Sequence, residues 1–306
     1  MAWVIDKQSL AGLKQPPSLC FNNLTSNVSS LAYIHRGNVV ISGLDGKLAR
    51  TLYNNAEGGI RALQVLLCSG EDFDFLVVAL NTGVQVWSTD GKRMIYFFEA
   101  HGSSASSSSR NDNAQFTQGI AMLPKGQLFV VGCSDGDVFV FEAKCGPKGE
   151  ACELKATLKG HEHPVTCAGA GEEICATGDA SGAIVVWSVD EPLMKDCSFD
   201  GDGNPATAVC ARDDKVVASF STGHLRIFDT SKKVLAIEIA AHSRIINAID
   251  LHPTSMQLVS VGEDMFLNVW ELPEKGQGGP SGQVRRVMTL SVCVSLLLAC
   301  KRLAGR

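Results

Sequence analysis

The sequence lacks an excess of basic residues. Its 306 residues include 27 lysines and arginines against 32 aspartates and glutamates, for a formal net charge of −5. Proteins that hold nucleic acid usually carry a basic patch or stripe for the phosphate backbone. The sequence contains no such stripe of Arg, Lys and aromatic residues, so we expect partners other than DNA or RNA.

Long apolar runs are also missing. The charge-free stretch at 287–300 has 14 residues, whereas a helix needs about 20 to cross a bilayer. The first residues, MAWVIDKQSLAGLK, contain early charges and no continuous apolar core, unlike a secretory signal. We therefore expect no membrane span and a cytoplasmic location, with a nuclear or vesicle-associated location left open.

Paired cysteines are absent as well. The 11 cysteines are odd in number and scattered, and no two are spaced as C-x-x-C. Structural zinc sites and disulfide frameworks usually show regular cysteine spacing. The cysteine pattern therefore argues against both and favours a reducing compartment.

Common enzyme motifs are missing too. No G-x-S-x-G, P-loop or G-x-G-x-x-G pattern occurs, so the usual residues for acyl hydrolysis and nucleotide turnover are not there. His161 and His163 flank Glu162, but no third ligand lies at a zinc-binding spacing. Residues 201–204 resemble half of a calcium loop without its distal glutamate. The sequence predicts no metal and no cofactor.

What the sequence does contain is a repeat. Six short segments each place a turn before an apolar run that ends in an aromatic residue or its equivalent. They are LDGKLARTL at 44–52, NTGVQVWS at 81–88, SDGDVFVFE at 134–142, ASGAIVVWS at 180–188, STGHLRIFD at 221–229 and GEDMFLNVWE at 262–271.

The repeat has a regular length. Its closing residues are separated by 36, 54, 46, 41 and 42 residues, a mean of 43.8; they are Thr51, Trp87, Phe141, Trp187, Phe228 and Trp270. A period of roughly 40–45 residues is typical of the four-stranded blades of a β-propeller. We therefore predict an all-β propeller in which each repeat supplies one blade.

Local patterns support strands over helices. In residues 254–271, two apolar runs of five to six residues flank the turn Gly262–Asp264, which is typical of a hairpin. The other five copies have glycine at the turn, where tight hairpins favour positive φ, whereas Met265 stands there in the sixth. Runs such as FLVVAL and LFVVGC are apolar on both faces and must be covered on both, as in stacked blades.

Residues of the sixth copy resemble the WD-repeat (β-transducin repeat) family. The resemblance implies a buried tetrad in which a histidine, a hydroxyl, a carboxylate and an indole are joined by hydrogen bonds. The full set occurs once, as His242, Ser260, Asp264 and Trp270. Each such bond contributes only about 0.5–1.5 kcal/mol, but removal of one partner leaves the others unsatisfied at a cost of about 1–3 kcal/mol.

The fourth copy matches this set only in part. His161, Thr177 and Trp187 fit, but Ser181 stands where the carboxylate is expected. The resemblance also implies a ring that is commonly seven-bladed.

We divide the chain into three parts on this basis. Residues 1–29 are expected to supply the closing outer strand, 30–279 the six readable blades, and 280–306 a partial last blade or a divergent C-terminus. The last part lacks the turn and aromatic-terminated run of a complete blade, so we expect an imperfectly closed ring. The serine-rich stretch 102–115 is expected to be a solvated loop.

Two functions compete. The first is a non-catalytic scaffold or adaptor that binds other proteins through its loop rim, and that self-associates if the incomplete blade borrows a strand. Its candidate contact residues, from placement alone, are His101, Arg110, His163, Asp179, Arg244 and Glu263.

The second function is a propeller enzyme with a metal or carboxylates in the central channel. The histidines do not recur at one strand position, which favours the scaffold.

Overall fold

The computed structural model describes most of the chain. The described residues are 17–18, 20–43, 48–52, 61–100, 116–124, 127–146, 149–190, 192–252, 254–273 and 284–291. The predicted turn at Gly46 and the serine-rich stretch 102–115 lie outside them.

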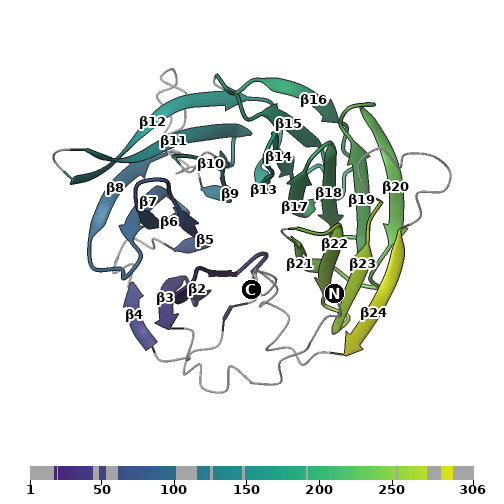
Figure 1. The fold of residues 1–306 in the computed structure, drawn as a ribbon, viewed down its shortest axis with the longest axis horizontal. Helices are drawn as coiled ribbons and strands as arrows, with labels where there is room; N and C mark the ends of the chain where they lie inside the picture. Colours follow the sequence, from purple (N-terminus) through teal and green to yellow (C-terminus); the bar gives the residue numbers. More distant parts are fainter. Residues whose placement is uncertain are drawn as a thin grey trace, which may run out of the picture.

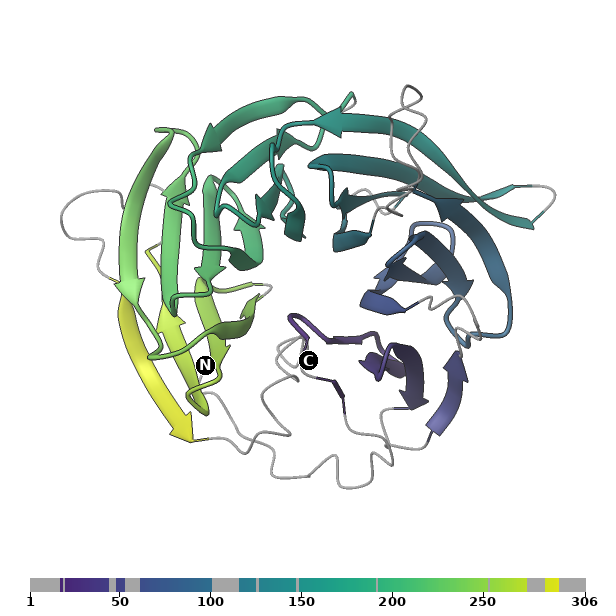
Figure 2. The same ribbon diagram turned by 180° about the vertical axis from the view of Figure 1, so that it is seen from behind.

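The described strands form six four-stranded antiparallel sheets, which stand as blades around a common axis (Figures 1 and 2). This arrangement confirms the predicted all-β propeller. The first three blades are β1 (Leu24–Ser26), β2 (Ser30–His35), β3 (Asn38–Gly43), β4 (Leu48–Leu52); β5 (Ala62–Ser69), β6 (Asp74–Leu80), β7 (Gly83–Ser88), β8 (Met94–Glu99); and β9 (Thr117–Met122), β10 (Leu128–Cys133), β11 (Asp137–Gly146), β12 (Gly149–Lys159). The last three are β13 (Val165–Ala170), β14 (Ile174–Asp179), β15 (Ile184–Ser188), β16 (Lys195–Phe199); β17 (Ala206–Arg212), β18 (Lys215–Phe220), β19 (His224–Asp229), β20 (Val234–Ala240); and β21 (Ile246–Leu251), β22 (Gln257–Gly262), β23 (Phe266–Glu271), β24 (Arg285–Ser291).

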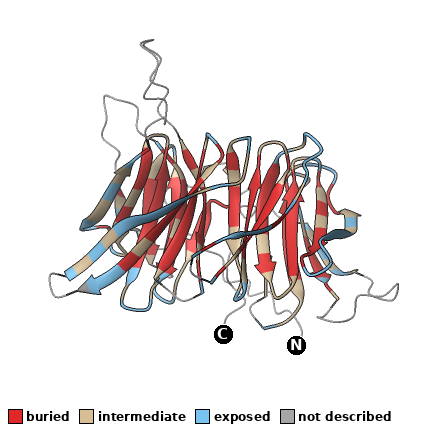
Figure 3. Ribbon diagram, turned by 90° about the horizontal axis from the view of Figure 1, so that it is seen from above, coloured by how far each residue is buried: buried red, intermediate tan, exposed pale blue. Residues whose placement is uncertain are grey.

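Burial follows the position of a strand in its blade. The second strands β6, β10 and β18 are buried at nearly every position, whereas the outer strand β20 is mostly exposed (Figure 3). Strands apolar on both faces are stable here because each blade packs between neighbours. Ring packing therefore replaces the helix layer that other sheets need.

Polar side chains of the first strands join neighbouring blades. The Oγ1 of Thr25 accepts a hydrogen bond from the Leu67 amide at 3.0 Å, and the Oε1 of Gln64 accepts one from the Gly119 amide at 2.6 Å. The Thr166 hydroxyl donates to the Ala206 carbonyl at 2.6 Å. These buried or partly buried groups hold the blades in register because leaving a partner without its hydrogen bond would cost free energy.

The first blade differs from the prediction. Thr51 lies on β4, the fourth strand of its sheet, whereas the other five closing residues lie on third strands. The third strand of the first blade is instead β3, after a tight turn at Arg36 and Gly37 with φ of 51° and 79°. The aromatic-terminated pattern is weak in this blade, so the sequence spacing shifted the assignment by one strand.

The two ends of the described ring also differ from the prediction. Strand β24 is the outer strand of the sixth blade, so the predicted boundary at 279/280 cuts that blade, and Arg285–Ser291 does not belong to a seventh. Strand β1 is the innermost strand of the first blade, whereas most of the segment 1–29 that was expected to supply a closing outer strand lies outside the described residues. Just before β1, the Asn22 amide donates to the Asn247 carbonyl at 3.1 Å, and its side chain donates to the Thr207 carbonyl at 3.3 Å. Asn22 thus connects the first blade to the fifth and sixth.

Candidate functional site

The sixth blade brings its four predicted tetrad residues together. His242 Nδ1 lies 2.9 Å from Asp264 Oδ1, and its Nε2 lies 2.8 Å from Ser260 Oγ. The Trp270 indole donates to the same hydroxyl at 2.8 Å. The side-chain NH2 of Asn268 also lies 3.3 Å from Nε2, so Nε2 is the acceptor, the Ser260 hydroxyl donates to it, and Nδ1 carries the proton that faces the carboxylate. Every member of this chain of hydrogen bonds thus has a partner.

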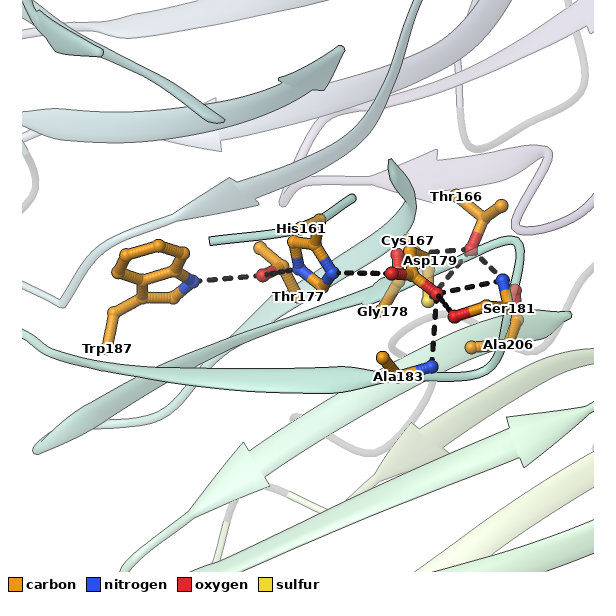
Figure 4. Close-up of polar contacts among 10 residues, drawn as sticks. All are labelled: His161, Thr166, Cys167, Thr177, Gly178, Asp179, Ser181, Ala183, Trp187 and Ala206. Carbon is orange, nitrogen blue, oxygen red and sulfur yellow. Dashed lines mark hydrogen bonds and ion pairs between the residues drawn. The ribbon is translucent and has the colours of Figure 1, made fainter. Parts of the chain in front are cut away.

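The fourth blade has the same chain of hydrogen bonds with a different carboxylate (Figure 4). His161 Nε2 lies 2.7 Å from Thr177 Oγ1, to which the Trp187 indole donates at 2.9 Å. His161 Nδ1 lies 2.9 Å from Asp179 Oδ2. The fourth blade therefore contains a complete tetrad, which the sequence analysis treated as lacking its carboxylate.

Asp179 corrects a second expectation. It was predicted as an exposed rim residue, but it is 1 % exposed. Its Oδ1 accepts hydrogen bonds from the Ser181 hydroxyl at 2.7 Å, the Ser181 amide at 2.8 Å and the Ala183 amide at 3.0 Å. Ser181 therefore supports the carboxylate and does not replace it.

The two carboxylates reach their histidines from different turn positions. Asp264 lies four residues after Ser260, whereas Asp179 lies two residues after Thr177. In the sixth blade the position matching Asp179 is Gly262, where a Cβ would lie 2.7 Å from His242 Nδ1. Only one of the two turn positions can carry a side chain toward the imidazole. A glycine at 262 in the sixth blade, against an aspartate at the matching position 179 in the fourth, was therefore the sequence signal that could have identified Asp179.

Both carboxylates are held ionised. Burial raises the pKa of Asp179, but hydrogen bonds from His161 and Ser181 outweigh it, so the pKa lies below its ordinary value. Burial likewise raises the pKa of Asp264, and hydrogen bonds from His242 and the amides of Ser243 and Phe266 bring the net pKa down. Each group is thus an acceptor only, as its partners require.

The remaining blades use other contacts at the closing position. The Trp87 indole donates to Gln85 Oε1 at 3.0 Å, within its own strand. Phe141 stacks on Phe129 with ring centroids 5.1 Å apart, and Phe228 lies 4.5 Å from Phe199. Aromatic packing replaces the polar chain there.

The tetrads hold loops at one edge of the ring, which we call the turn rim. It consists of the second-to-third-strand turns at 134–136, 180–183, 221–223 and 263–265 and the blade-entering loops at 161–164, 201–205 and 242–245. The turns at 134–136, 180–183 and 221–223 each touch the loop that enters the next blade; for example, the amide of His242 donates to the Gly223 carbonyl at 3.0 Å. A Cβ on Gly136 would lie 2.3 Å from the His161 carbonyl, so only glycine fits there.

The rim candidates fall into three groups. His163, Arg244 and Glu263 are exposed on the turn rim, and Asp179 is buried beneath it. His101 and Arg110 lie outside the described residues. Phe266 was not among the predicted surface residues, although it and Met265 are 42 % and 49 % exposed.

The motifs considered for metals have structural partners. His161 is occupied by its tetrad, and Asp202 forms an ion pair with Arg226, whose guanidinium lies 4.4 Å from the Phe220 ring. Among the residues that the structure describes, no group of three or more His, Cys, Asp or Glu side chains could hold a metal ion. No helix within the described ranges is long and apolar enough to cross a membrane.

Comparison with solved structures agrees with the propeller. A chain in the crystal structure of a mitotic checkpoint complex superposes with a TM-score of 0.68 at 14 % identity, over 96 % of this chain and 87 % of that one. This likeness concerns the fold.

Comparison with known sequences gives the family. The chain is 31 % identical to mouse (Mus musculus) WD repeat-containing protein 54 and 29 % identical to its human (Homo sapiens) counterpart, in each case over 211 residues, or 67 % of this chain. The match spans 61 % of the length of these relatives. The family model for WDR54 matches residues 49–301. The chain therefore belongs to the WDR54 family of WD-repeat proteins.

Proposed function

We propose that this chain is a non-catalytic scaffold or adaptor that binds other proteins through the turn rim. The observation that carries the proposal is that the polar side chains of the turn rim form two groups, one shielded and hydrogen-bonded, the other exposed. The side chains of His161 and His242 are shielded from solvent, those of their carboxylates Asp179 and Asp264 are 1 % and 8 % exposed, and each histidine is hydrogen-bonded to its carboxylate. Arg244 and Glu263 are exposed on loops that these buried groups hold in place.

Such a rim suits recognition of protein surfaces. Loops on a rigid scaffold can vary in sequence without loss of the core, and they start from a fixed conformation, which lowers the entropy lost on binding. Membership of a WD-repeat family supports the same role.

The alternative is a propeller enzyme with a metal or a carboxylate site in the central channel. It would need several His, Asp or Glu side chains facing the axis from the first strands. The described first strands carry Thr25 and Gln64 at buried positions and Thr166 at a partly buried one, and these side chains form hydrogen bonds between blades. Metal analysis of the purified protein separates the two functions, because stoichiometric zinc or calcium would favour the enzyme.

Proximity labelling in cells tests the scaffold. We compare the wild type with Arg244→Glu and with Glu263→Lys, each of which reverses one exposed charge on the turn rim. The control is Glu172→Lys, an exposed residue in the turn between β13 and β14 at the opposite edge of the sheet. We expect the rim variants to lose labelled partners that the control keeps. An unchanged partner set in both rim variants would count against the proposal.

Two further parts of the proposal concern where and with what the chain binds. We propose a cytoplasmic location, which the scattered and unpaired spacing of the 11 cysteines along the sequence supports; recovery of the chain from secretory compartments would contradict it. Self-association is a second mode of partner binding. Size-exclusion chromatography with light scattering tests it, and a single-copy mass at all concentrations would rule it out.

A further inference from the structure

The turn between β22 and β23 differs from the other described turns of the rim. Gly136, Gly182 and Gly223 take positive φ at this position, with values of 90°, 87° and 83°. In the sixth blade, Met265 takes the position with φ of 64°. The residue after it, Phe266, is 42 % exposed.

Met265 is an unfavourable choice for folding alone. A side chain in the left-handed region meets the following carbonyl, which glycine avoids. The cost is not recovered by burial, since Met265 is 49 % exposed. Strain that the fold does not need points to a role for the side chain at the surface.

The turn presents these two side chains rigidly. Asp264, fixed by His242, accepts hydrogen bonds from the Ser243 amide at 3.0 Å and the Phe266 amide at 3.1 Å. The Met265 amide donates to the Gly262 carbonyl at 3.1 Å. Pre-organised apolar side chains bind without a large loss of conformational entropy.

Opposite charges flank the apolar pair. The Glu263 amide donates to the Ile245 carbonyl at 2.8 Å, which holds the loop containing Arg244 against the turn. Arg244 and Glu263 are exposed, and neither forms an ion pair with another described residue. A phosphate backbone would meet Glu263 unfavourably, whereas a protein segment with one carboxylate can approach Arg244 and avoid Glu263.

We propose that Met265 and Phe266 form the anchor point of the turn rim, and that they bind a protein segment carrying an apolar side chain next to an acidic residue. The apolar side chain packs on Met265 and Phe266, and the carboxylate pairs with Arg244. Methionine adapts its shape to different partners, and aromatic side chains are enriched at interface centres. This inference rests on the proposed function and names its contact point.

A displayed library of random 12-residue peptides on the purified full chain tests it. We expect enriched peptides to share an apolar residue beside Asp or Glu. By fluorescence anisotropy, Phe266→Ser and Met265→Gly should each weaken the best peptide by about tenfold or more. Arg244→Glu should weaken it as well, and a peptide with Lys in place of its acidic residue should recover binding to this variant.

The control is Val28→Ser, which removes an apolar side chain that is 81 % exposed, in the turn between β1 and β2 at the opposite edge of the sheet. It should leave peptide binding unchanged. No enriched peptide family, or equal binding by the wild type and Phe266→Ser, would overturn the inference. If the peptide experiment fails but proximity labelling of cellular partners still depends on Arg244 and Glu263, the proposed scaffold function is retained and only the contact point at Met265 and Phe266 is wrong. A loss of peptide affinity in Val28→Ser equal to that in Phe266→Ser would also overturn the inference.

Discussion

The Asp179 carboxylate lies 2.9 Å from Nδ1 of His161, on a residue only two positions after the hydroxyl that binds the other ring nitrogen. In the sixth blade the same role belongs to Asp264, four positions after Ser260. One hydrogen-bonded arrangement is thus built from two different turn positions.

Removal of the Asp179 carboxylate should destabilise the chain strongly. Asp179→Ala leaves the His161 imidazole and the amides of Ser181 and Ala183 without their acceptor. Unsatisfied buried groups cost about 1–3 kcal/mol each, so we expect a loss of roughly 2–4 kcal/mol in the free energy of unfolding. Urea denaturation measures it. The exposed Glu172→Gln should change stability by less than about 0.5 kcal/mol, and an equally small effect of Asp179→Ala would contradict the tetrad.

Stability should fall in acid through these carboxylates. The folded state lowers the pKa of Asp179 and Asp264 below the ordinary value of 3.8. Their contribution is therefore fully present above the unfolded value and is lost as pH falls from about 4 through the folded pKa. Unfolding free energies measured between pH 7 and pH 3 should drop less steeply for Asp179→Asn than for the wild type. Parallel pH profiles would show that Asp179 is not the group responsible.

Relief of strain at Met265 should stabilise the fold. Met265→Gly removes a side chain at φ of 64°, and we expect a gain of roughly 1 kcal/mol. Gly223→Ala introduces the same strain at φ of 83° and should lose a similar amount or more. Thermal unfolding compares both variants. A destabilised Met265→Gly would mean that the methionine contributes to folding and would remove the strain argument for its role in binding.

Close packing between blades should not tolerate a side chain at Gly169. A Cβ there would lie 2.2 Å from the Val209 carbonyl oxygen, which is backbone and cannot rotate away. We expect Gly169→Ala to cost about 1–3 kcal/mol by overpacking. Ser198→Ala, an exposed position on β16, serves as the control in the same urea series. Unchanged stability of Gly169→Ala would place β13 and β17 further apart than described.

Much of the fold could be predicted from the sequence because blade formation depends on local patterns. The hairpin at Leu258–Trp270 follows from two short apolar runs and a turn, and β22 and β23 pair there as the pattern predicts. The strands of the first blade were assigned wrongly because Thr51 is not aromatic. Repeat spacing alone placed it on a third strand, whereas it lies on β4. The segment Arg285–Ser291 was assigned to a partial last blade because residues 272–284 separate it in sequence from its partner β23.

The site was less predictable because it depends on direction in space. Asp179 and Ser181 alternate along the turn, and only the structure shows which side chain points at His161 (Figure 4). The exposure of Phe266 could not be read from an apolar run that also contains the buried Val269 and Trp270. The position of a residue in the repeat predicts which strand it belongs to, but packing against the neighbouring blade determines whether its side chain is buried.

The most direct test of rim binding is hydrogen–deuterium exchange of the purified chain with and without the strongest partner from proximity labelling. The account predicts slower amide exchange at 242–245 and 263–266 in the complex, with no change on the outer strands β16 and β20. Protection confined to those outer strands or to the turn between β13 and β14 would contradict it.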